Sequence, residues 1–387
     1  MTDAQLLAFV LIAYYLWDCL LWVPPRTTVL VKAGKAWRIS RPLELLKRRH
    51  LEMHLLPILP PAGRVQTATH PSLSFSIEGV VAYTPQAPNP GNRPGQSGAF
   101  IRWDDIGSIH AKGREIHVNG LLFYKAACSV EALFTARWMQ GIRKTVKGSR
   151  EEVIDDYLRE VFRDKAARER LEATRRPLKT MGSLSLLLFL WIFVAIPVAH
   201  WKWGLENVWI PLLSTMLLLM WTQAILFQRA HKKAFPEADE ERFVGFLSAL
   251  LTPPGAIRIP DRFAREILVF LHPVQVMNLL MTREDARSHI HAVMRDLEHP
   301  IAPLCPLEDP STCETVASFR QALRRHLVRH LAKKDWKESD WQAMPEATEP
   351  VHLSYCPRCV AQYIHKEGKC EDCGGLELRP LKEETKD

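Results

Sequence analysis

The sequence predicts an α+β membrane protein with three transmembrane helices, a strand-rich cytoplasmic domain, a helical cytoplasmic region and a small metal-binding module at the C-terminus. Three observations predict this class: apolar runs of about 20 residues, a strand-like alternation after the first run, and two C-x-x-C pairs near the end of the 387-residue chain. A bilayer core needs about 20 apolar residues of helix, because each helical residue advances about 1.5 Å. The expected segments, in order, are an anchor (1–23), a strand-rich domain (24–147), an amphipathic helix (148–180), a transmembrane hairpin (181–227), a helical domain (228–350), and the metal-binding module with its tail (351–387).

Two of the apolar runs follow each other closely and predict a membrane hairpin. Met181–Trp201 and Val208–Phe227 contain no acidic or basic side chain apart from His200. The connection Lys202–Asn207 is too short for anything but a tight turn. The two runs therefore predict antiparallel transmembrane helices within residues 181–227.

The third run, Ala4–Val23, is also long enough to span a bilayer. A cleaved signal peptide would require Lys or Arg before the run and small residues at its end. The chain instead has Met1-Thr2-Asp3 before the run and Trp22-Val23-Pro24-Pro25 at its end, which favours an uncleaved anchor. Asp18 lies inside this run. It is either a functional ionisable group or an interfacial residue close to the headgroups, and the second interpretation is favoured.

The basic residues predict the orientation of the spans. No basic side chain precedes the first run, and Lys202 is the one basic residue in the hairpin connection, whereas Lys and Arg gather at the other flanks. Because cytoplasmic loops carry an excess of Lys and Arg, we expect the N-terminus outside the cell (inner) membrane and the large segments with the C-terminus in the cytoplasm. The formal charge of +8 then reflects topology more than a nucleic-acid surface.

Residues 24–147 alternate between apolar and polar positions, which predicts antiparallel strands. Asn119-Gly120 predicts a hairpin turn, and the apolar repeat at every fourth residue from Val130 to Val146 predicts a closing helix with one buried stripe. With that helix, the phrases IRWDDIGSI and REIHVNGLLFYKA resemble the bacterial pleckstrin-homology-like (PH-like) domain over about residues 100–143. The resemblance implies a membrane-proximal binding or assembly module, which in some members engages phosphoinositide headgroups. The basic run Lys47-Arg48-Arg49 is either a lipid contact or, as we favour, a solvated flank.

The predicted helices outside the membrane carry weaker chemical signals. Ser149-Arg150-Glu151-Glu152 has the spacing of a capping box, and Thr252-Pro253-Pro254-Gly255 predicts a helix end. The helix over residues 314–334 is rich in Arg and Lys. A basic helix of this kind can bind phosphate backbones or acidic partners, although an ordinary solvated face is favoured.

Two histidine pairs are candidate metal ligands of low specificity. His326 and His330 lie one helical turn apart, but no carboxylate accompanies them at catalytic spacing. His50 and His54 occur in HLEMH, where the Glu is misplaced for the general base of the HExxH pattern. Neither pair predicts a metalloprotease.

The strongest chemical signal is at the C-terminus, where Cys356 and Cys359 form one C-x-x-C pair and Cys370 and Cys373 form a second. A hairpin that joins the pairs would offer four sulfurs in a tetrahedron about 2.3 Å from a zinc ion. The segment resembles a small zinc ribbon over about residues 354–380, with Val360 where many ribbons have glycine. A closed four-thiolate site predicts structural zinc; iron and an unrelated set of cysteines are the alternatives. The remaining cysteines, expected to be free thiols, are Cys19, Cys128, Cys305 and Cys313.

The motifs that would indicate an enzyme are missing from the sequence. It contains no GxxxxGK[ST] loop, no GxGxxG after a strand, no GxSxG elbow and no kinase signature, so no catalytic residue and no small-molecule substrate is identified. We expect an interaction or assembly platform on the cytoplasmic side of the membrane, with the lipid bilayer and cytoplasmic proteins as partners. Membrane-tethered nucleic-acid binding and an uncharacterised membrane enzyme are the alternatives. The sequence leaves open whether the protein is an enzyme, and the missing motifs favour the answer that it is not.

Overall fold

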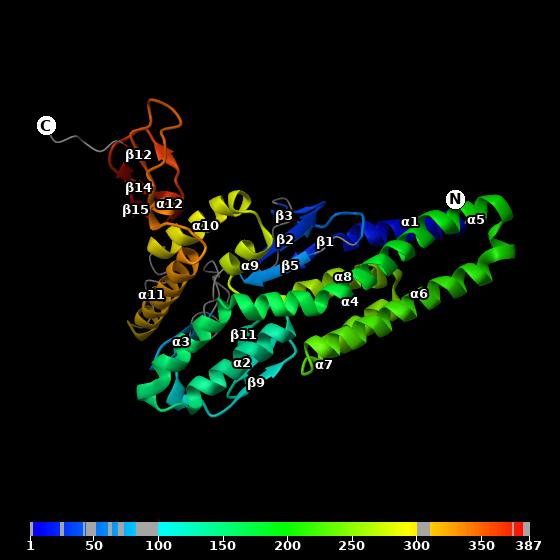
Figure 1. The fold of residues 1–387 in the computed structure, drawn as a ribbon, viewed down its shortest axis with the longest axis horizontal. Helices are drawn as coiled ribbons and strands as arrows, with labels where there is room; N and C mark the ends of the chain where they lie inside the picture. The colour runs from blue at the N-terminus through cyan, green and yellow to red at the C-terminus, as the bar shows by residue number, and fades with distance from the viewer. Residues whose placement is uncertain are drawn as a thin grey trace, which may run out of the picture. The chain divides into compact units, whose positions relative to one another are not determined.

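The computed structural model describes residues 3–23, 27–41, 43, 52–60, 64–68, 73–82, 100–299, 310–373 and 375–381 (Figure 1). The chain forms two compact units. Unit 1 consists of residues 1–71, 106–141 and 163–279, and unit 2 consists of residues 72–105, 142–162 and 280–387. The strand-rich segment 24–147 therefore contributes residues to both units.

The helices supply most of the regular structure. They are α1 (Asp3–Asp18), α2 (Ser129–Lys144), α3 (Arg150–Val161), α4 (Asp164–Leu190), α5 (Ile196–Trp203), α6 (Leu205–Ala234), α7 (Asp239–Leu251), α8 (Pro253–Ile267), α9 (Pro273–Leu280), α10 (Arg283–Glu298), α11 (Pro310–Ala332) and α12 (Glu338–Gln342). A π-helical segment, Trp191–Ala195, joins α4 to α5 without a break in the helix.

The strands are short and pair in antiparallel fashion throughout the described residues. They are β1 (Leu20–Val23), β2 (Thr27–Ala33), β3 (Ala36–Ile39), β4 (Glu52–Leu55), β5 (Arg64–Ala68), β6 (Leu73–Phe75), β7 (Gly79–Ala82), β8 (Phe100–Arg102), β9 (Ile109–Lys112), β10 (Glu115–Val118), β11 (Leu121–Lys125), β12 (Ser354–Tyr355), β13 (Gln362–Tyr363), β14 (Lys369–Cys370), β15 (Leu376–Glu377) and β16 (Arg379–Pro380). The sheet orders are β1-β4, β3-β2-β5, β6-β7-β8, β11-β10-β9, β13-β12-β16 and β14-β15.

Two helices are long and apolar enough to cross a membrane, Asp164–Trp203 and Val208–Ala234. They contain both runs of the predicted hairpin, and Figure 1 shows α4–α5 and α6 running side by side and joined at one tip. Only 28% and 22% of their most apolar windows are buried, whereas the core helix of a soluble protein is mostly buried. Most of these apolar windows are therefore not buried in a protein core.

The predicted N-terminal span, Ala4–Val23, differs from the structure. Helix α1 ends at Asp18 and has 16 residues, so it is about 24 Å long, shorter than a bilayer core of about 30 Å. Leu20–Val23 instead forms β1, which pairs with β4. A short apolar run fits a buried strand as well as a helix, and here the hydrogen bonds to β4 decide between them.

The amphipathic helix predicted over residues 148–180 is also corrected. It is two helices, because α3 ends at Val161 and α4 begins at Asp164 and continues through Pro177 into the apolar run. Ser149 precedes α3 without a side-chain capping hydrogen bond, so the capping-box interpretation is wrong. The helical structure is interrupted at Phe162 and Arg163. The buried ring of Phe162 stacks on His330 within unit 2.

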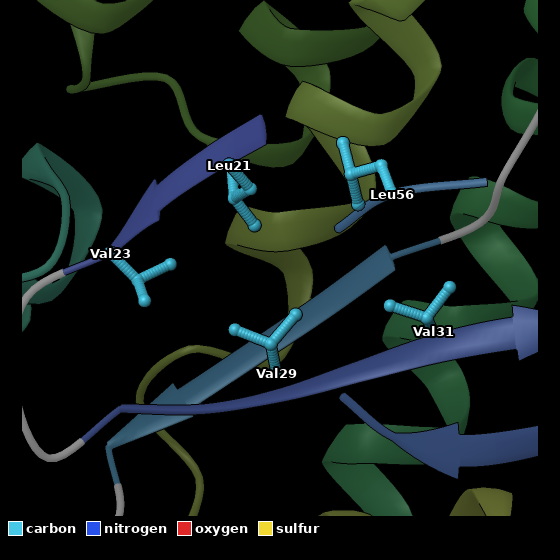
Figure 2. Close-up of a cluster of buried hydrophobic side chains, with 5 residues drawn as sticks. All are labelled: Leu21, Val23, Val29, Val31 and Leu56. Carbon is cyan, nitrogen blue, oxygen red and sulfur yellow. The ribbon is translucent and has the colours of Figure 1, made fainter. Parts of the chain in front are cut away.

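The small sheets of unit 1 enclose an apolar cluster. Figure 2 shows Leu21 and Val23 from β1, Val29 and Val31 from β2, and Leu56 after β4, all buried in the same interior. Along β1 the burial alternates with the period of two that is typical of a strand with one buried face, whereas β2 buries Val29, Leu30 and Val31 in succession. The cluster ties the chain after α1 to the first sheet.

The segment that resembles a PH-like domain is divided between two sheets. β8 pairs with β7, whereas β9, β10 and β11 form a separate sheet that α2 follows. The predicted hairpin at Asn119-Gly120 is confirmed, since both residues have positive φ, 53° and 80°, as a tight turn of this kind requires. The basic run Lys47-Arg48-Arg49, His50 and Cys305 lie outside the described residues.

Unit 2 has an aromatic core. The ring of Phe75 on β6 packs against Trp103, Tyr157 and Phe319, with centroids 5.2 to 6.3 Å apart. The Trp103 indole donates a hydrogen bond to the Ser76 carbonyl at 2.8 Å. This core joins the β6-β7-β8 sheet to α3 and α11, and α11 in turn packs with α10 beside the C-terminal ribbon.

Candidate metal centre

The C-terminal ribbon is built from very short strands and two tight turns. The strands β13, β12 and β16 form one sheet, and β14 pairs with β15. Cys356 follows β12, and Cys370 ends β14 directly before a 3₁₀ turn that contains Cys373. The pairs of strands thus bring the two C-x-x-C turns together, as their spacing predicts.

The two turns differ at the residue that closes them. The Val360 N–H donates to the Cys356 carbonyl, and the Gly375 N–H donates to the Cys370 carbonyl, both at 2.9 Å. Both residues have positive φ, 64° for Val360 and 86° for Gly375. This conformation suits glycine, but it is unfavourable for a β-branched residue. The backbone of the first turn is therefore strained at Val360, the position where many ribbons have glycine.

The four predicted ligands lie together. One ligand atom from each of Cys356, Cys359, Cys370 and Cys373 lies within 4.8 Å of all the others. Three of the cysteines are buried and Cys359 is exposed. Within the part of the chain that the structure describes, this is the one group of three or more His, Cys, Asp or Glu side chains close enough to share a metal ion.

The sulfur geometry fits a tetrahedral metal. The Cys359 and Cys370 sulfurs are 3.7 Å apart. Four sulfurs about 2.3 Å from a central zinc ion would be about 3.8 Å from one another. Four thiolates are also the ligand set of structural zinc sites, and they leave no position open for a substrate. The cluster can therefore hold a metal ion such as zinc in a structural role.

A neighbouring hydroxyl activates one of the thiols. The Tyr363 hydroxyl donates a hydrogen bond to the Cys370 sulfur at 3.1 Å. Burial would raise the pKa of the Cys370 thiol, but hydrogen bonds, first from Tyr363 and then from Cys356 and Cys359, lower it to about 7. Burial raises the pKa of Cys359 and of Cys373. The Cys370 thiolate is thus the more readily formed at neutral pH, and a bound cation would favour ionisation of Cys359 and Cys373.

The ribbon is packed against the rest of unit 2 through charged groups. The Arg358 guanidinium, between the ligands Cys356 and Cys359, donates a hydrogen bond to the Asp296 carboxylate of α10. Arg295, also on α10, interacts electrostatically with Cys359 and Glu298. These contacts place two arginines beside a site that would carry negative charge once its thiols are ionised.

The histidine pairs do not form metal sites within the described residues. His326 forms a 2.6 Å hydrogen bond with Asp155, and His330 stacks on Phe162, so both side chains are used in packing α11. His54 forms a hydrogen bond with Ser40. The metal hypothesis for these histidines therefore has no support in the geometry.

Two of the six Arg and Lys residues in the predicted basic helix 314–334 are already paired with carboxylates. Arg320 lies 3.8 Å from Asp296, and Arg324 donates to Glu298 and Glu338 at 2.8 and 2.6 Å. Arg325 and Arg329 on the other side of the helix, and Lys333 directly after it, are exposed. The helix thus presents fewer available charges than its sequence suggests.

A buried polar network that the sequence does not reveal surrounds α8 in unit 1. Arg258 donates to Asp261, to the Cys19 sulfur and to the Pro57 carbonyl at 3.2, 2.7 and 2.9 Å, and lies 3.8 Å from Asp18. Asp18, the last residue of α1, therefore also forms an ion pair with α8. A signal was available in the charged residues of α8, but the sequence does not show which of them meet partners from distant segments.

A second buried pair lies on the same helix. His231 of α6 and Glu266 of α8 form a 2.8 Å hydrogen bond, and both side chains have no exposed surface. Eleven of the 15 residues of α8 are buried. A buried ionisable group is costly unless it has a partner, so this pair fixes the register between α6 and α8.

Comparisons with protein-family models, with curated protein sequences and with solved structures find no match to this chain. The argument for function therefore comes from the residues of the chain itself, chiefly the four clustered cysteines and the two long apolar helices.

Proposed function

We propose that this protein is a multi-pass membrane protein whose water-facing parts form an assembly platform for other proteins. A closed four-cysteine site carries the proposal. Such a site supplies a rigid surface rather than chemistry, because its zinc ion would have no coordination position left for a substrate. The ion pair between Arg358 and Asp296 fastens that surface to α10, so a partner bound there would be held by the whole of unit 2.

The membrane placement rests on the two long apolar helices and the charges around them. The hairpin α4–α6 would cross the cell (inner) membrane, with the ribbon on the cytoplasmic side, because Lys and Arg flank the open ends of the hairpin. A PH-like module over residues 100–143, facing the membrane, belongs to the same proposal. The third span stays a prediction, since α1 is shorter than the bilayer core.

The platform is tested by capture of partners from crosslinked intact cells. We expect proteins captured with the full chain to be lost when all four cysteines of the ribbon are replaced by serine. Cys313→Ser is the matched control, because Cys313 lies outside the cluster. An identical set of captured proteins from both variants would contradict the proposal.

The membrane placement is tested separately. The chain should remain with membranes after alkaline extraction, and release into solution would contradict it.

A second candidate function is nucleic-acid binding, favoured by the exposed side chains of Arg325 and Arg329 on α11 and of Lys333 directly after it. Phosphate contacts release counterions, so this function requires affinity for DNA or RNA that falls steeply with salt concentration. Full-length protein in detergent that showed no salt-sensitive retention on immobilised DNA or heparin would remove this candidate. The platform is favoured, because two of the helix's arginines are already paired with carboxylates.

A further inference from the structure

A groove of about 690 Å³ lies within unit 2, beside the ribbon. Its walls come from α10, α11, the segment after α12, and the ribbon. This volume is in the range of about 300–1,000 Å³ that binding pockets occupy. The groove is separate from the four-cysteine site, although Val360 and Pro357 of the first cysteine turn line its edge.

The groove is rich in guanidinium groups. Arg295, Arg320, Arg324 and Arg379 line it, whereas Glu298 is the one acidic side chain among the described lining residues. Glu298 is already used, because it accepts hydrogen bonds from Arg324, Trp341 and Gln342 at 2.8, 3.2 and 3.1 Å. The groove therefore offers positive charge without a free carboxylate to neutralise it.

The arginines are not equally available. Arg324 is held by two carboxylates, and Arg320 has one at 3.8 Å. Arg379 is exposed, whereas Arg295 interacts electrostatically with Cys359 and Glu298. The Arg295 Nε is buried, and no hydrogen-bond partner for it lies among the described groups. Arg379, with support from Arg295 and Arg320, thus supplies donors that a ligand can use.

The chemistry of a guanidinium group selects the ligand. Its planar fork of N–H donors matches a carboxylate or phosphate group. A nucleic acid would in addition need exposed aromatic faces for its bases. The aromatic residues at this groove, Trp341 and Tyr355, are buried, with 2% and 8% of their surface exposed. The rest of the lining includes aliphatic residues such as Leu297, Ala317 and Ala343, which suit the backbone and side-chain stems of a peptide.

We infer that this groove docks an acidic peptide segment of a partner protein, with Arg379 binding a carboxylate directly and Arg320, which lies 3.8 Å from Asp296, adding positive charge beside it. The inference rests on the proposed platform function and names the chemistry of its partner. Carboxylate side chains spaced along an extended peptide would meet the two arginines, and the aliphatic wall would contact the peptide between them.

The test uses the full-length, zinc-loaded protein in detergent and a fluorescent peptide of alternating glutamate and glycine. Fluorescence anisotropy should show binding that Arg379→Gln weakens by about ten-fold or more, as the loss of one charge-assisted hydrogen bond predicts. Arg325→Gln removes the same charge from the exposed side of α11 outside the groove and should leave the affinity within about two-fold. Equal losses in the two variants would overturn the inference, because they would indicate unspecific attraction.

A second variant protects the test from a folding artefact. Ala317 is exposed at the groove, so Ala317→Glu should repel the glutamate peptide, whereas Ala317→Gln should bind it more tightly than Ala317→Glu by about ten-fold. All variants should retain their zinc. An oligothymidine that binds more tightly than the peptide and loses affinity in Arg379→Gln would overturn the inference in favour of nucleic acid.

Failure of this inference is distinguishable from failure of the platform. If Arg379→Gln captures the same partners from crosslinked cells as the unaltered chain, while the quadruple cysteine variant loses them, the platform stands and the groove is not its docking site. If neither variant changes the captured set, the platform itself fails.

Discussion

The ribbon and helix α8 both bury polar groups at their centres, but they stabilise those groups in opposite ways. The ribbon's core consists of Cys356, Cys370 and Cys373, with only a few partly buried apolar side chains around it. Helix α8 buries Arg258, Asp261 and Glu266 among many apolar residues. Arg258 pairs with Asp261 on the helix itself and with the Cys19 sulfur, and Glu266 pairs with His231 of α6. The four cysteines of the ribbon could hold an ion from outside the chain, whereas the charged groups of α8 are paired with groups of unit 1. The comparison predicts different responses to metal removal, to loss of one partner and to pH.

Metal removal should have the largest effect and should be confined to the ribbon. In zinc-finger peptides, structural zinc contributes about 10 kcal/mol or more to the free energy of folding. Strands of two residues cannot compensate for the loss of so large a contribution. A strong chelator should make residues 354–381 sensitive to protease and leave α8 protected. Cys370→Ser should have the same effect without a chelator. Protease resistance of the ribbon in both cases would show that it folds without metal.

Among changes at α8, the loss of one member of the buried His231–Glu266 pair should destabilise the protein most. His231→Ala leaves the Glu266 carboxylate buried without its partner, so it should lower the free energy of unfolding by about 3–5 kcal/mol. The double variant His231→Phe/Glu266→Leu removes both polar groups and should cost much less. Thermal unfolding in detergent measures both. If the double variant were as unstable as the single variant, the hydrogen bond between His231 and Glu266 would do more than offset the cost of burying the two polar groups.

The buried carboxylate of Glu131, which is held by hydrogen bonds and feels the charge of Arg114, extends the comparison to pH. Burial raises the pKa of Glu131 to about 7, although hydrogen bonds from the Ala127 N–H and the Tyr124 hydroxyl act to lower it. The folded state then binds more protons than the unfolded state between the unfolded pKa of 4.5 and about pH 7. The stability contributed by Glu131 is therefore fully present below the unfolded pKa and is lost as the pH rises through about 7.

Glu131→Gln is the corresponding variant, because its amide oxygen can still accept from the Ala127 N–H. It should match the unaltered protein near pH 4.5 and be more stable by up to about 3 kcal/mol at pH 8, at about 1.4 kcal/mol per pH unit. Unfolding curves at several pH values measure the difference. A constant difference across this pH range would mean that Glu131 is ionised in the folded protein at every pH tested.

Helix caps should give the smallest effects, one in each unit. Thr252 accepts a hydrogen bond from the Gly255 N–H at the start of α8, and Thr282 accepts one from the Asp285 N–H at the start of α10. Replacement of either threonine by alanine should cost about 1 kcal/mol. Proteolysis of the native protein can assign each loss to its own unit. A much larger loss for Thr252→Ala would indicate that the start of α8 has a further role.

Local features of the fold were predictable from the sequence. The hairpin runs have almost no charge, Asn119-Gly120 fits the only turn geometry that joins β10 to β11 closely, and the spacing of the four cysteines brings them together without any distant contact. In each case, the residues that determine the structure lie within one short segment. Such features can be inferred without knowledge of the rest of the chain.

Features that depend on distant partners were not predictable. Leu20–Val23 is apolar enough for a helix, and only its pairing with β4 makes it a strand. Arg258 is an ordinary charged residue in the sequence, but in the structure it meets Cys19 and Pro57 from the N-terminal part of unit 1. The groove lined by Arg379 likewise requires helices and ribbon together. Hydrophobic periodicity does not indicate which polar side chains find one another.

The most direct test of the account is metal analysis of the purified full-length protein combined with X-ray absorption at the zinc edge. The account predicts one zinc ion per chain with four sulfur neighbours at about 2.3 Å, and loss of that ion when Cys356, Cys359, Cys370 and Cys373 are replaced by serine. Zinc retained by the quadruple variant, or nitrogen and oxygen neighbours in place of sulfur, would contradict it.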